Sequence, residues 1–223
     1  MQIFAKLSRV SRERKLELFN QTFCPGERTR VLDVGAEIAC GPAEQALQLI
    51  DVYPWKHMIS ALNLSREHIE HIKKVYPEVN GVVGNACDGL PWPDGYFDVV
   101  YCNAVIEHLG TLSRQRKLAS EIMRVGRGWF VTTPNRWYPF EFHLRLPLVT
   151  WLPFHGYHWA SRLIHYNHVE KKYTYLSGIC DEELRLMTVR ELRCCFPDSK
   201  IVRQRVTFMP ETLVAVGRAT PRT

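Results

Sequence analysis

The stretch that decides the fold is Arg30-Val31-Leu32-Asp33-Val34-Gly35-Ala36-Glu37-Ile38-Ala39-Cys40-Gly41. A short apolar run ends in Asp-x-Gly, and a helical pattern soon follows, as where a buried parallel strand leads into a nucleotide-binding turn. Glycine allows backbone N–H groups to approach a ligand closely, and a helix N-terminus favours electron-rich groups. Glu37 and Ala39 stand where a regular fingerprint has glycines. The stretch therefore predicts a cofactor-binding turn with an altered glycine pattern.

Short apolar runs and helical patterns alternate outward from this stretch. Strands are predicted at Val31–Val34, Met58–Leu62, Gly81–Val83, Phe97–Cys102 and Trp129–Thr132. Helices are predicted at about 11–22, Ala43–Val52, Arg66–Tyr76, Val105–Leu109, Ser113–Val125 and Thr188–Cys195. The alternation favours right-handed crossovers in a parallel sheet covered on both faces. Two last runs, Lys200–Val206 and Thr212–Val216, are close enough to predict an antiparallel hairpin that ends the sheet.

Composition narrows the class of protein. The 223 residues and the 46% hydrophobic content fit one globular domain. No apolar run approaches the ~20 residues that span a bilayer, and the first ten residues lack the apolar core of a signal peptide. Seven cysteines without a CxxC pair favour a reducing cytoplasm over a disulfide framework or a zinc ribbon. The net charge of +6 is concentrated in residues 9–15, which predict a solvated helix face, with nucleic acid or an anionic membrane as alternatives.

Residues 134–180 differ from the rest of the chain, because they are rich in proline, histidine and tryptophan and show no clean period. They are too few for a core of their own, so we expect an insertion rather than a second domain. The apolar stretch 146–154 predicts a lid over an acceptor, with a membrane-facing patch or a dimer contact as alternatives. His-x-x-His spacing at 155–158 and 165–168 can suit a metal on a helix. Since no cysteine pair or HExxH pattern accompanies it, we expect no metal site.

Five motifs in order support a family resemblance. They are Asp33–Gly35, Ala61–Ser65 after the second strand, Gly84–Ala86 after the third, Leu90–Val100 with Glu107–Leu109, and Thr132–Trp137 after the fifth. With these motifs the chain resembles the class I S-adenosylmethionine-dependent methyltransferases, and within them the methyltransferase type 11 group. The resemblance implies an α/β, Rossmann-like, doubly wound, seven-stranded sheet whose last strand is antiparallel, with an insertion after the fifth strand.

The resemblance also implies a division of one domain, 1–223, into functional parts. An N-terminal helix region covers 11–29, and a cofactor-binding half covers 30–133. A variable substrate or lid insertion follows at 134–180, and a helix and hairpin complete the chain at 181–223.

S-adenosylmethionine is the cofactor that the resemblance implies. Its expected contacts are Asp33, Gly35, Ala36, Glu37, Asn63, Leu64, Asn85, Ala86 and Asn103. Asp33 anchors the glycine turn or meets the methionine ammonium through water. Glu37 either caps the next helix or contacts that ammonium. Alternatively the family match resumes at Cys40, so that 37–39 form an insertion in the loop.

Two asparagines depart from the family pattern. Asn63 stands where a carboxylate usually accepts the ribose hydroxyls, and an amide lacks the charge-assisted strength of that bond. The expected loss is about 1 kcal/mol of binding free energy. Asn85 replaces the acid that receives the adenine amino group, and its side-chain carbonyl can still accept that bond.

The expected chemistry needs few catalytic groups. Methyl transfer depends mainly on alignment of the acceptor with the methyl group and on exclusion of water, although a hydroxyl acceptor benefits from a general base. His143 is the first candidate for a base or substrate contact, and His108 is the second. Both have a structural role as the alternative. The resemblance assigns substrate contacts to Asn135, Trp137, Tyr138 and Glu141.

The sequence therefore predicts methyl transfer to an oxygen or nitrogen of a small-molecule, glycan or lipid-linked acceptor, with peripheral membrane contact as an option. The alternative is a catalytically silent member of the fold that serves as a partner subunit or ligand sensor, which the two asparagines and the altered turn favour. Nucleic acid is not an expected substrate, because the sequence has no RNA-recognition motif.

Overall fold

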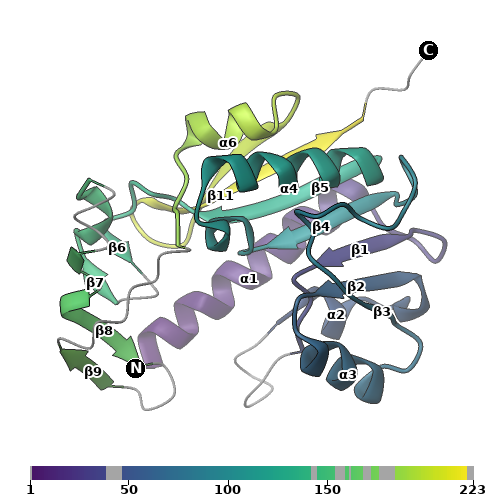
Figure 1. Cartoon of the computed structure of the whole chain (residues 1–223), viewed down its shortest axis with the longest axis horizontal. Coiled ribbons are helices and arrows are strands. Elements are labelled where there is room, and N and C mark those ends of the chain that lie inside the picture. The colour runs from purple at the N-terminus through teal and green to yellow at the C-terminus, as the bar shows by residue number, and fades with distance from the viewer. Residues whose placement is uncertain are drawn as a thin grey trace.

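The computed structural model (Figure 1) describes residues 2–38, 47–141, 145–153, 159–160, 162–167, 172–175 and 184–219. Its main sheet contains β1 (Val31–Val34), β2 (Ile59–Asn63), β3 (Asn80–Val83), β4 (Val99–Asn103), β5 (Gly128–Pro134), β10 (Lys200–Arg205) and β11 (Pro210–Arg218). The seven strands lie in the order β10-β11-β5-β4-β1-β2-β3. β11 is antiparallel to both of its neighbours, whereas β4, β1, β2 and β3 pair in parallel. This arrangement confirms the predicted fold and the predicted C-terminal hairpin.

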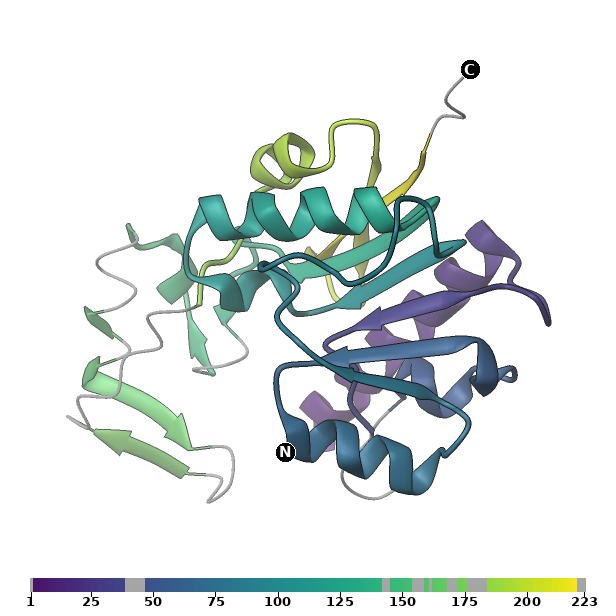
Figure 2. The same cartoon turned by 45° about the vertical axis from the view of Figure 1, so that its right-hand side comes forward.

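Helices cover both faces of the sheet (Figure 2). α4 (Leu112–Val125) and α6 (Val189–Cys195) pack on one face, where Leu118, Ile122 and Val131 are buried together. α1 (Gln2–Phe23), the short α2 (Leu49–Val52) and α3 (Arg66–Val75) pack on the other. Because both faces are covered, the central strands read as nearly continuous apolar runs rather than as alternating ones.

α1 is longer than the predicted helix at 11–22. No glycine or proline occurs before Pro25, so no backbone constraint ends the helix within its first 22 residues. Phe19 fixes the helix on the sheet, with ring centroids 5.4 Å from Tyr101 and 5.7 Å from Phe130. Cys24 then takes a positive φ of 45°, and Pro25 stops the helix. The packing of α1 on the sheet brings Arg12 and Lys15 to the carboxyl edge.

α3, α4 and α6 begin at side-chain caps. Ser65 and Thr111 accept hydrogen bonds from backbone N–H groups of the first turns of α3 and α4. Thr188 and Glu191 form a capping box at the start of α6. The helix predicted at 43–52 is represented by α2, and residues 39–46 lie outside the described part of the chain. The helix predicted at 105–109 is a short 3-10 helix, η2 (Ile106–Leu109).

The region predicted as an insertion contains short strands that its sequence did not suggest. β6 (Phe140–Glu141) pairs with β7 (Leu146–Pro147), and β8 (Ile164–Asn167) pairs with β9 (Lys172–Tyr175). Strands of two to four residues are too short to show a period-2 pattern. A 3-10 turn, η3 (Val149–Trp151), lies between them in the chain. We call the described residues between 136 and 175 the lobe, which projects from one end of the sheet (Figure 1).

Among the described helices, none combines the length and the apolar character that crossing a membrane requires.

Candidate cofactor and acceptor site

A cavity of about 420 Å³ opens at the carboxyl ends of β1, β2 and β4. β1 and β4 are neighbours in the sheet although β2 and β3 lie between them in the chain, so the cavity sits at the topological switch point where such folds bind ligands. Eight of the nine predicted cofactor residues line it: Asp33, Gly35, Glu37, Asn63, Leu64, Asn85, Ala86 and Asn103. The ninth, Ala36, is buried in the turn beside them. His108 also lines the cavity.

Gly35 is the residue on which the turn after β1 depends. Its φ is +76°, and a Cβ at this position would lie 2.4 Å from Val105 Cγ2. The N–H groups of Gly35 and Ala36 both donate to the Leu62 carbonyl, at 2.8 and 3.1 Å. The turn is therefore hydrogen-bonded to β2 on one side and packs closely against Val105 on the other. The altered pattern keeps the glycine that this geometry requires.

Asn63 has a structural function that explains why it is an amide. Its Nδ2 donates to the Ala36 carbonyl at 2.9 Å, and its Oδ1 accepts from the Ser65 N–H at 2.8 Å. A carboxylate could accept the second bond but could not donate the first. Asn85 is different, because its Oδ1 accepts from the Cys87 N–H at 3.0 Å while its Nδ2 bonds to no protein group in the described residues.

The charged groups of the cavity come from opposite walls. Burial, together with the nearby carboxylates of Asp51 and Glu37, raises the pKa of Asp33 to about 8. The Glu37 side chain is half-exposed, and its Oε1 lies 3.7 Å from His68 Nδ1. Arg12 enters from α1, and its burial lowers the guanidinium pKa while Tyr101 and Glu37 oppose that shift. The cavity thus offers both a cation and carboxyl groups.

Arg12 corrects part of the sequence interpretation, which treated residues 9–15 as a solvated helix face. The side chain lies in the cavity wall because α1 crosses the sheet edge there. Charge alone did not distinguish Arg12 from its neighbours. The signal that could have found it is helical spacing, because Arg12, Lys15 and Phe19 recur on one face of the helix and Phe19 is an apolar residue suited to the core.

Lys15 forms a buried polar cluster beside the cavity. Its Nζ donates to Asn103 Oδ1 at 2.7 Å, and Thr132 Oγ1 donates to the same oxygen at 2.8 Å. An ammonium carries donors only, so this contact identifies the amide atom as oxygen and fixes the orientation of Asn103. Burial, and to a smaller extent Arg12, lowers the Lys15 pKa to about 8, although Glu107 and Glu211 oppose the shift. No sequence motif predicted this lysine as part of the site.

The predicted substrate residues lie beyond β5 and do not line the cavity. Asn135 donates from Nδ2 to the Pro210 carbonyl at 2.9 Å and accepts from the Trp137 N–H at 3.1 Å, which shapes the turn after the strand. The Tyr138 hydroxyl lies 3.0 Å from Thr207 Oγ1. Trp137 is half-exposed, and Glu141 is buried. Their assignment to a substrate stays a prediction.

The predicted catalytic residues have different outcomes. His108 lies in η2 at the cavity wall, where its backbone N–H donates to the Val105 carbonyl at 3.0 Å. His143 lies outside the described residues, so its role stays a prediction. The same holds for His155, His158 and His168 of the His-x-x-His pairs. Within the ranges that the structure describes, no group of three or more His, Cys, Asp or Glu residues is placed to hold a metal ion.

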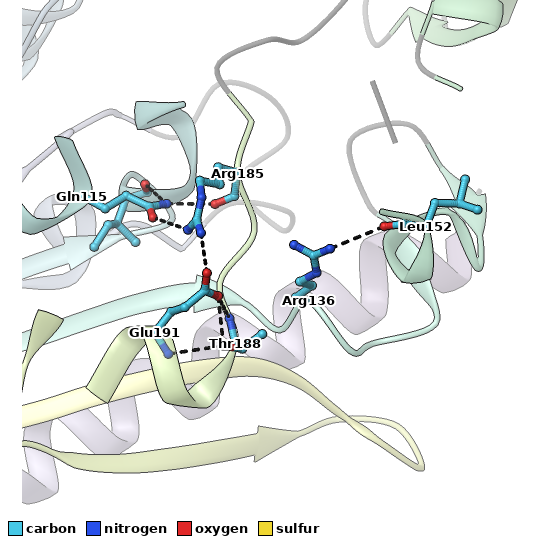
Figure 3. Close-up of polar contacts among 7 residues, drawn as sticks. Gln115, Arg136, Leu152, Arg185, Thr188 and Glu191 are labelled. Atoms are coloured by element: carbon cyan, nitrogen blue, oxygen red, sulfur yellow. Dashed lines mark hydrogen bonds and ion pairs between the residues drawn. The ribbon is translucent and has the colours of Figure 1, made fainter. Parts of the chain in front are cut away.

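A second polar network fixes the segment that returns from the lobe (Figure 3). Arg185 donates to Gln115 Oε1 at 2.7 Å and forms an ion pair with Glu191. Gln115 Nε2 donates to the carbonyls of Ile106 and Arg185, at 3.0 and 2.9 Å. The Arg185 N–H also donates to the Glu107 carbonyl at 2.7 Å. The network therefore joins α4, α6 and η2, the element that carries His108.

Comparison with known proteins agrees with this geometry. Residues 36–131 match a family model described as a methyltransferase domain, of the type 11 group. A probable S-adenosylmethionine-dependent methyltransferase of Mycolicibacterium smegmatis is 32% identical over 100 residues, which are 45% of this chain and 37% of that protein. The chain thus matches well under half of the length of this curated relative.

Two solved structures show the same fold. A protein from Pyrococcus horikoshii aligns with a TM-score of 0.59 and 17% identity, over 94% of this chain and 90% of its own. The N-terminal domain of EvdMO1 with SAH bound aligns with a TM-score of 0.53 and 18% identity, over 94% and 81%. The fold of the chain is therefore that of these two structures. Residues 36–131 are similar to the methyltransferase type 11 domain, the group that the sequence motifs predicted.

Proposed function

We propose that the protein transfers a methyl group from S-adenosylmethionine to an oxygen or nitrogen of a small-molecule, glycan or lipid-linked acceptor. The observation that carries the proposal is the cavity at the switch point of the sheet, which eight of the nine predicted cofactor residues line within or next to the matched domain. A cytoplasmic location belongs to the proposal and is supported by the free thiols of the described cysteines.

The residues of the cavity fit the polar ends of this cofactor. Glu37 would hold the methionine ammonium and Arg12 the methionine carboxylate, because these charges are complementary. Asp33 would join Glu37 once the bound ammonium favours the ionised form of its carboxyl group. Asn63 and Asn85 would accept hydrogen bonds from the ribose and the adenine with the lone pairs that their protein contacts leave. When bound, the cofactor supplies a methyl group already activated by a sulfonium.

The remaining work of the chain is to orient the acceptor and to exclude water. Asn103 lies at the end of β4 with its oxygen fixed by Lys15 and Thr132, and its Nδ2 bonds to no protein group in the described residues. This amide would donate a hydrogen bond to an acceptor oxygen. His108 lines the cavity and would take a proton from a hydroxyl acceptor, whereas an amine acceptor needs only to bind in its neutral form.

Calorimetric titration with S-adenosylhomocysteine tests the cofactor half of the proposal. We expect saturable binding that weakens about tenfold in Arg12→Ala, because a charge-assisted contact is lost. Lys6→Ala, an exposed cation on the same helix, should bind as the unsubstituted protein does. No detectable binding at millimolar ligand would remove the cofactor from the proposal.

A labelled-methyl transfer screen of glycan, quinone and lipid extracts tests the reaction. We expect label in one of these acceptor classes, and the label should disappear when S-adenosylhomocysteine is added in excess. Binding of S-adenosylhomocysteine without transfer to any extract would favour the silent partner or sensor instead. The two measurements therefore separate an inactive member of the fold from an enzyme.

A further inference from the structure

The lobe concentrates the exposed apolar side chains of the molecule. More than half of the large apolar side chains that the structure exposes lie between 136 and 175. They include three tryptophans, two leucines and a tyrosine: Trp137, Trp151, Trp159, Leu148, Leu152 and Tyr175. Trp159 is 65% exposed and Tyr175 70% exposed. Such a concentration marks an interaction surface rather than scattered exposed residues.

Hydrogen bonds to backbone carbonyls connect several segments of the lobe. The Trp151 indole N–H donates to the Trp137 carbonyl at 3.2 Å. Arg136 reaches the Leu152 carbonyl at 3.4 Å, as Figure 3 shows. The Tyr173 hydroxyl donates to the Arg145 carbonyl at 2.9 Å, which ties β9 to the segment before β7. Because the polar groups of Trp151 and Tyr173 are satisfied by the protein, their rings remain for apolar contact.

The charge of the lobe identifies the kind of partner. The described residues of the lobe include four basic residues, Arg136, Arg145, Arg162 and Lys172, against one acidic residue, Glu141. Glu141 is buried, and the basic residues of the described lobe outnumber it. A basic lobe repels a second copy of itself, which disfavours a dimer through this face. Leucines have no complementary group on a phosphate backbone, which disfavours nucleic acid.

Tryptophan, tyrosine and arginine together match a lipid interface. Indole and phenol rings settle at the headgroup level of a bilayer, leucines enter the acyl boundary, and cations attract anionic headgroups. We propose that the lobe docks on the surface of an anionic lipid bilayer, lying in the interface without crossing it. Docking would present a lipid-linked acceptor to the nearby carboxyl end of the sheet, and this consequence rests on the proposed function.

Vesicle co-sedimentation of the full chain tests the docking. Phosphatidylcholine vesicles with and without phosphatidylglycerol serve as probes. We expect roughly tenfold stronger partitioning with the anionic lipid, reduced but not abolished by high salt, because the apolar part of the binding does not depend on charge. In vesicles of brominated lipid, tryptophan fluorescence should be quenched.

A double variant, Trp151→Ala with Trp159→Ala, should lose about tenfold or more of the partitioning, since two interfacial anchors are removed. Val75→Ser, which alters a similarly exposed apolar residue on α3, should partition as the unsubstituted protein does. S-adenosylhomocysteine titration of each variant reports folding and the cofactor site independently of lipid.

Several outcomes would overturn the docking. They are absence of partitioning at low salt, equal partitioning of the double variant, binding of RNA without binding of vesicles, and dimerisation that the double variant abolishes. Vesicle binding by a protein that fails to bind S-adenosylhomocysteine would keep the docking and remove the methyl transfer. Cofactor binding without vesicle binding would do the reverse.

Discussion

Gly35 is the residue on which the cofactor turn depends, because its conformation and its neighbour both exclude a side chain. In Gly35→Ala the new Cβ would meet Val105 Cγ2 at 2.4 Å and the backbone would be strained at φ +76°. We expect the free energy of unfolding to fall by about 2–4 kcal/mol, from strain and overpacking together. Urea unfolding measures the loss, and S-adenosylhomocysteine binding should weaken in parallel.

Two further variants separate the two causes of this loss of stability, which are backbone strain and the steric contact with Val105. Gly89→Ala has a positive φ of +98° but no atom within 4 Å of the added Cβ, so it reports backbone strain alone. Val105→Ala removes the atom that Gly35→Ala would strike, and the double variant should recover part of the lost stability. If Gly89→Ala costs as much as Gly35→Ala, the contact with Val105 is not the decisive feature.

We expect the replacement of asparagine by aspartate to have different effects at positions 63 and 85. At Asn63 it should lower stability, and at Asn85 it should strengthen ligand binding. Asn63→Asp removes the donor to the Ala36 carbonyl, places two oxygens 2.9 Å apart and should cost about 1–3 kcal/mol of stability. Asn85→Asp keeps the bond from the Cys87 N–H and adds a charge that favours the adenine amino group. We expect it to strengthen S-adenosylhomocysteine binding several-fold with little change in stability. Calorimetry and urea unfolding of both variants check this, and tighter binding by Asn63→Asp at unchanged stability would contradict it.

Asp33 predicts the pH dependence of stability. Its pKa is about 8 in the folded protein and 3.8 ordinarily, so the folded state holds a proton that the unfolded state releases between these values. The free energy of unfolding contributed by Asp33 therefore falls as pH rises from about 4 to about 8. The lowered pKa of Lys15 acts only above about 8, where it makes stability rise with pH.

Asp33→Asn should remove this decline, so that the variant gains several kcal/mol relative to the unsubstituted protein between pH 5 and pH 8. Urea unfolding at the two pH values measures the gain. Asp88→Asn, at an exposed position, is the matched control. An unchanged slope in Asp33→Asn would show that Asp33 is ionised in the folded state.

At the scale of elements, the segment that returns from the lobe depends on Arg185. Removal of its side chain leaves the Gln115 and Glu191 oxygens without their partner in a largely buried place. We expect Arg185→Ala to cost about 2–4 kcal/mol of unfolding free energy. Arg190→Ala, exposed on the same α6, should cost less than about 0.5 kcal/mol. Equal losses in the two variants would contradict a structural role for the network.

The elements differ in how far their sequence determined them. β1, β2, β4 and β5 are buried on both faces, so apolar runs and turn residues located them within two or three residues. η2 was expected as a helix of the right extent, but a sequence does not distinguish a 3-10 turn from an α-helical one. The strands of the lobe could not be predicted, because they are shorter than the alternating pattern that identifies a strand.

The candidate site was predictable where backbone motifs define it and not where distant elements meet. The residues after β1, β2, β3 and β4 share one edge because parallel strands end together, and local motifs suffice to find them. Arg12 and Lys15 reach the same edge through the packing of α1, which depends on Phe19 meeting Tyr101 and Phe130 far along the chain. No local sequence pattern encodes these contacts between residues far apart in the chain.

At the scale of the whole molecule, contacts of α1 link the C-terminal strands β10 and β11 to the cavity. Gln204 of β10 donates to Ser11 at 2.9 Å, and Arg14 donates to the Arg205 carbonyl. Arg218 of β11 donates to the Thr22 carbonyl at 2.8 Å. The helix that supplies Arg12 is thus held by the C-terminal hairpin. Ligand binding in the cavity should therefore change the local stability of elements far from the motifs of the matched domain.

Hydrogen exchange with and without S-adenosylhomocysteine measures this coupling. A ligand at 100 times its dissociation constant stabilises the folded state by about 2.7 kcal/mol, and elements that touch it gain the most protection. We expect added protection in the turn after β1, in 103–109 and in α1 around Arg12, and little in β6–β9, because the lobe residues do not line the cavity. Arg12→Ala should remove the protection of α1 while that of the β1 turn persists. Protection confined to the lobe would instead place the ligand there, and would make the cavity at the β1–β4 switch point the wrong site.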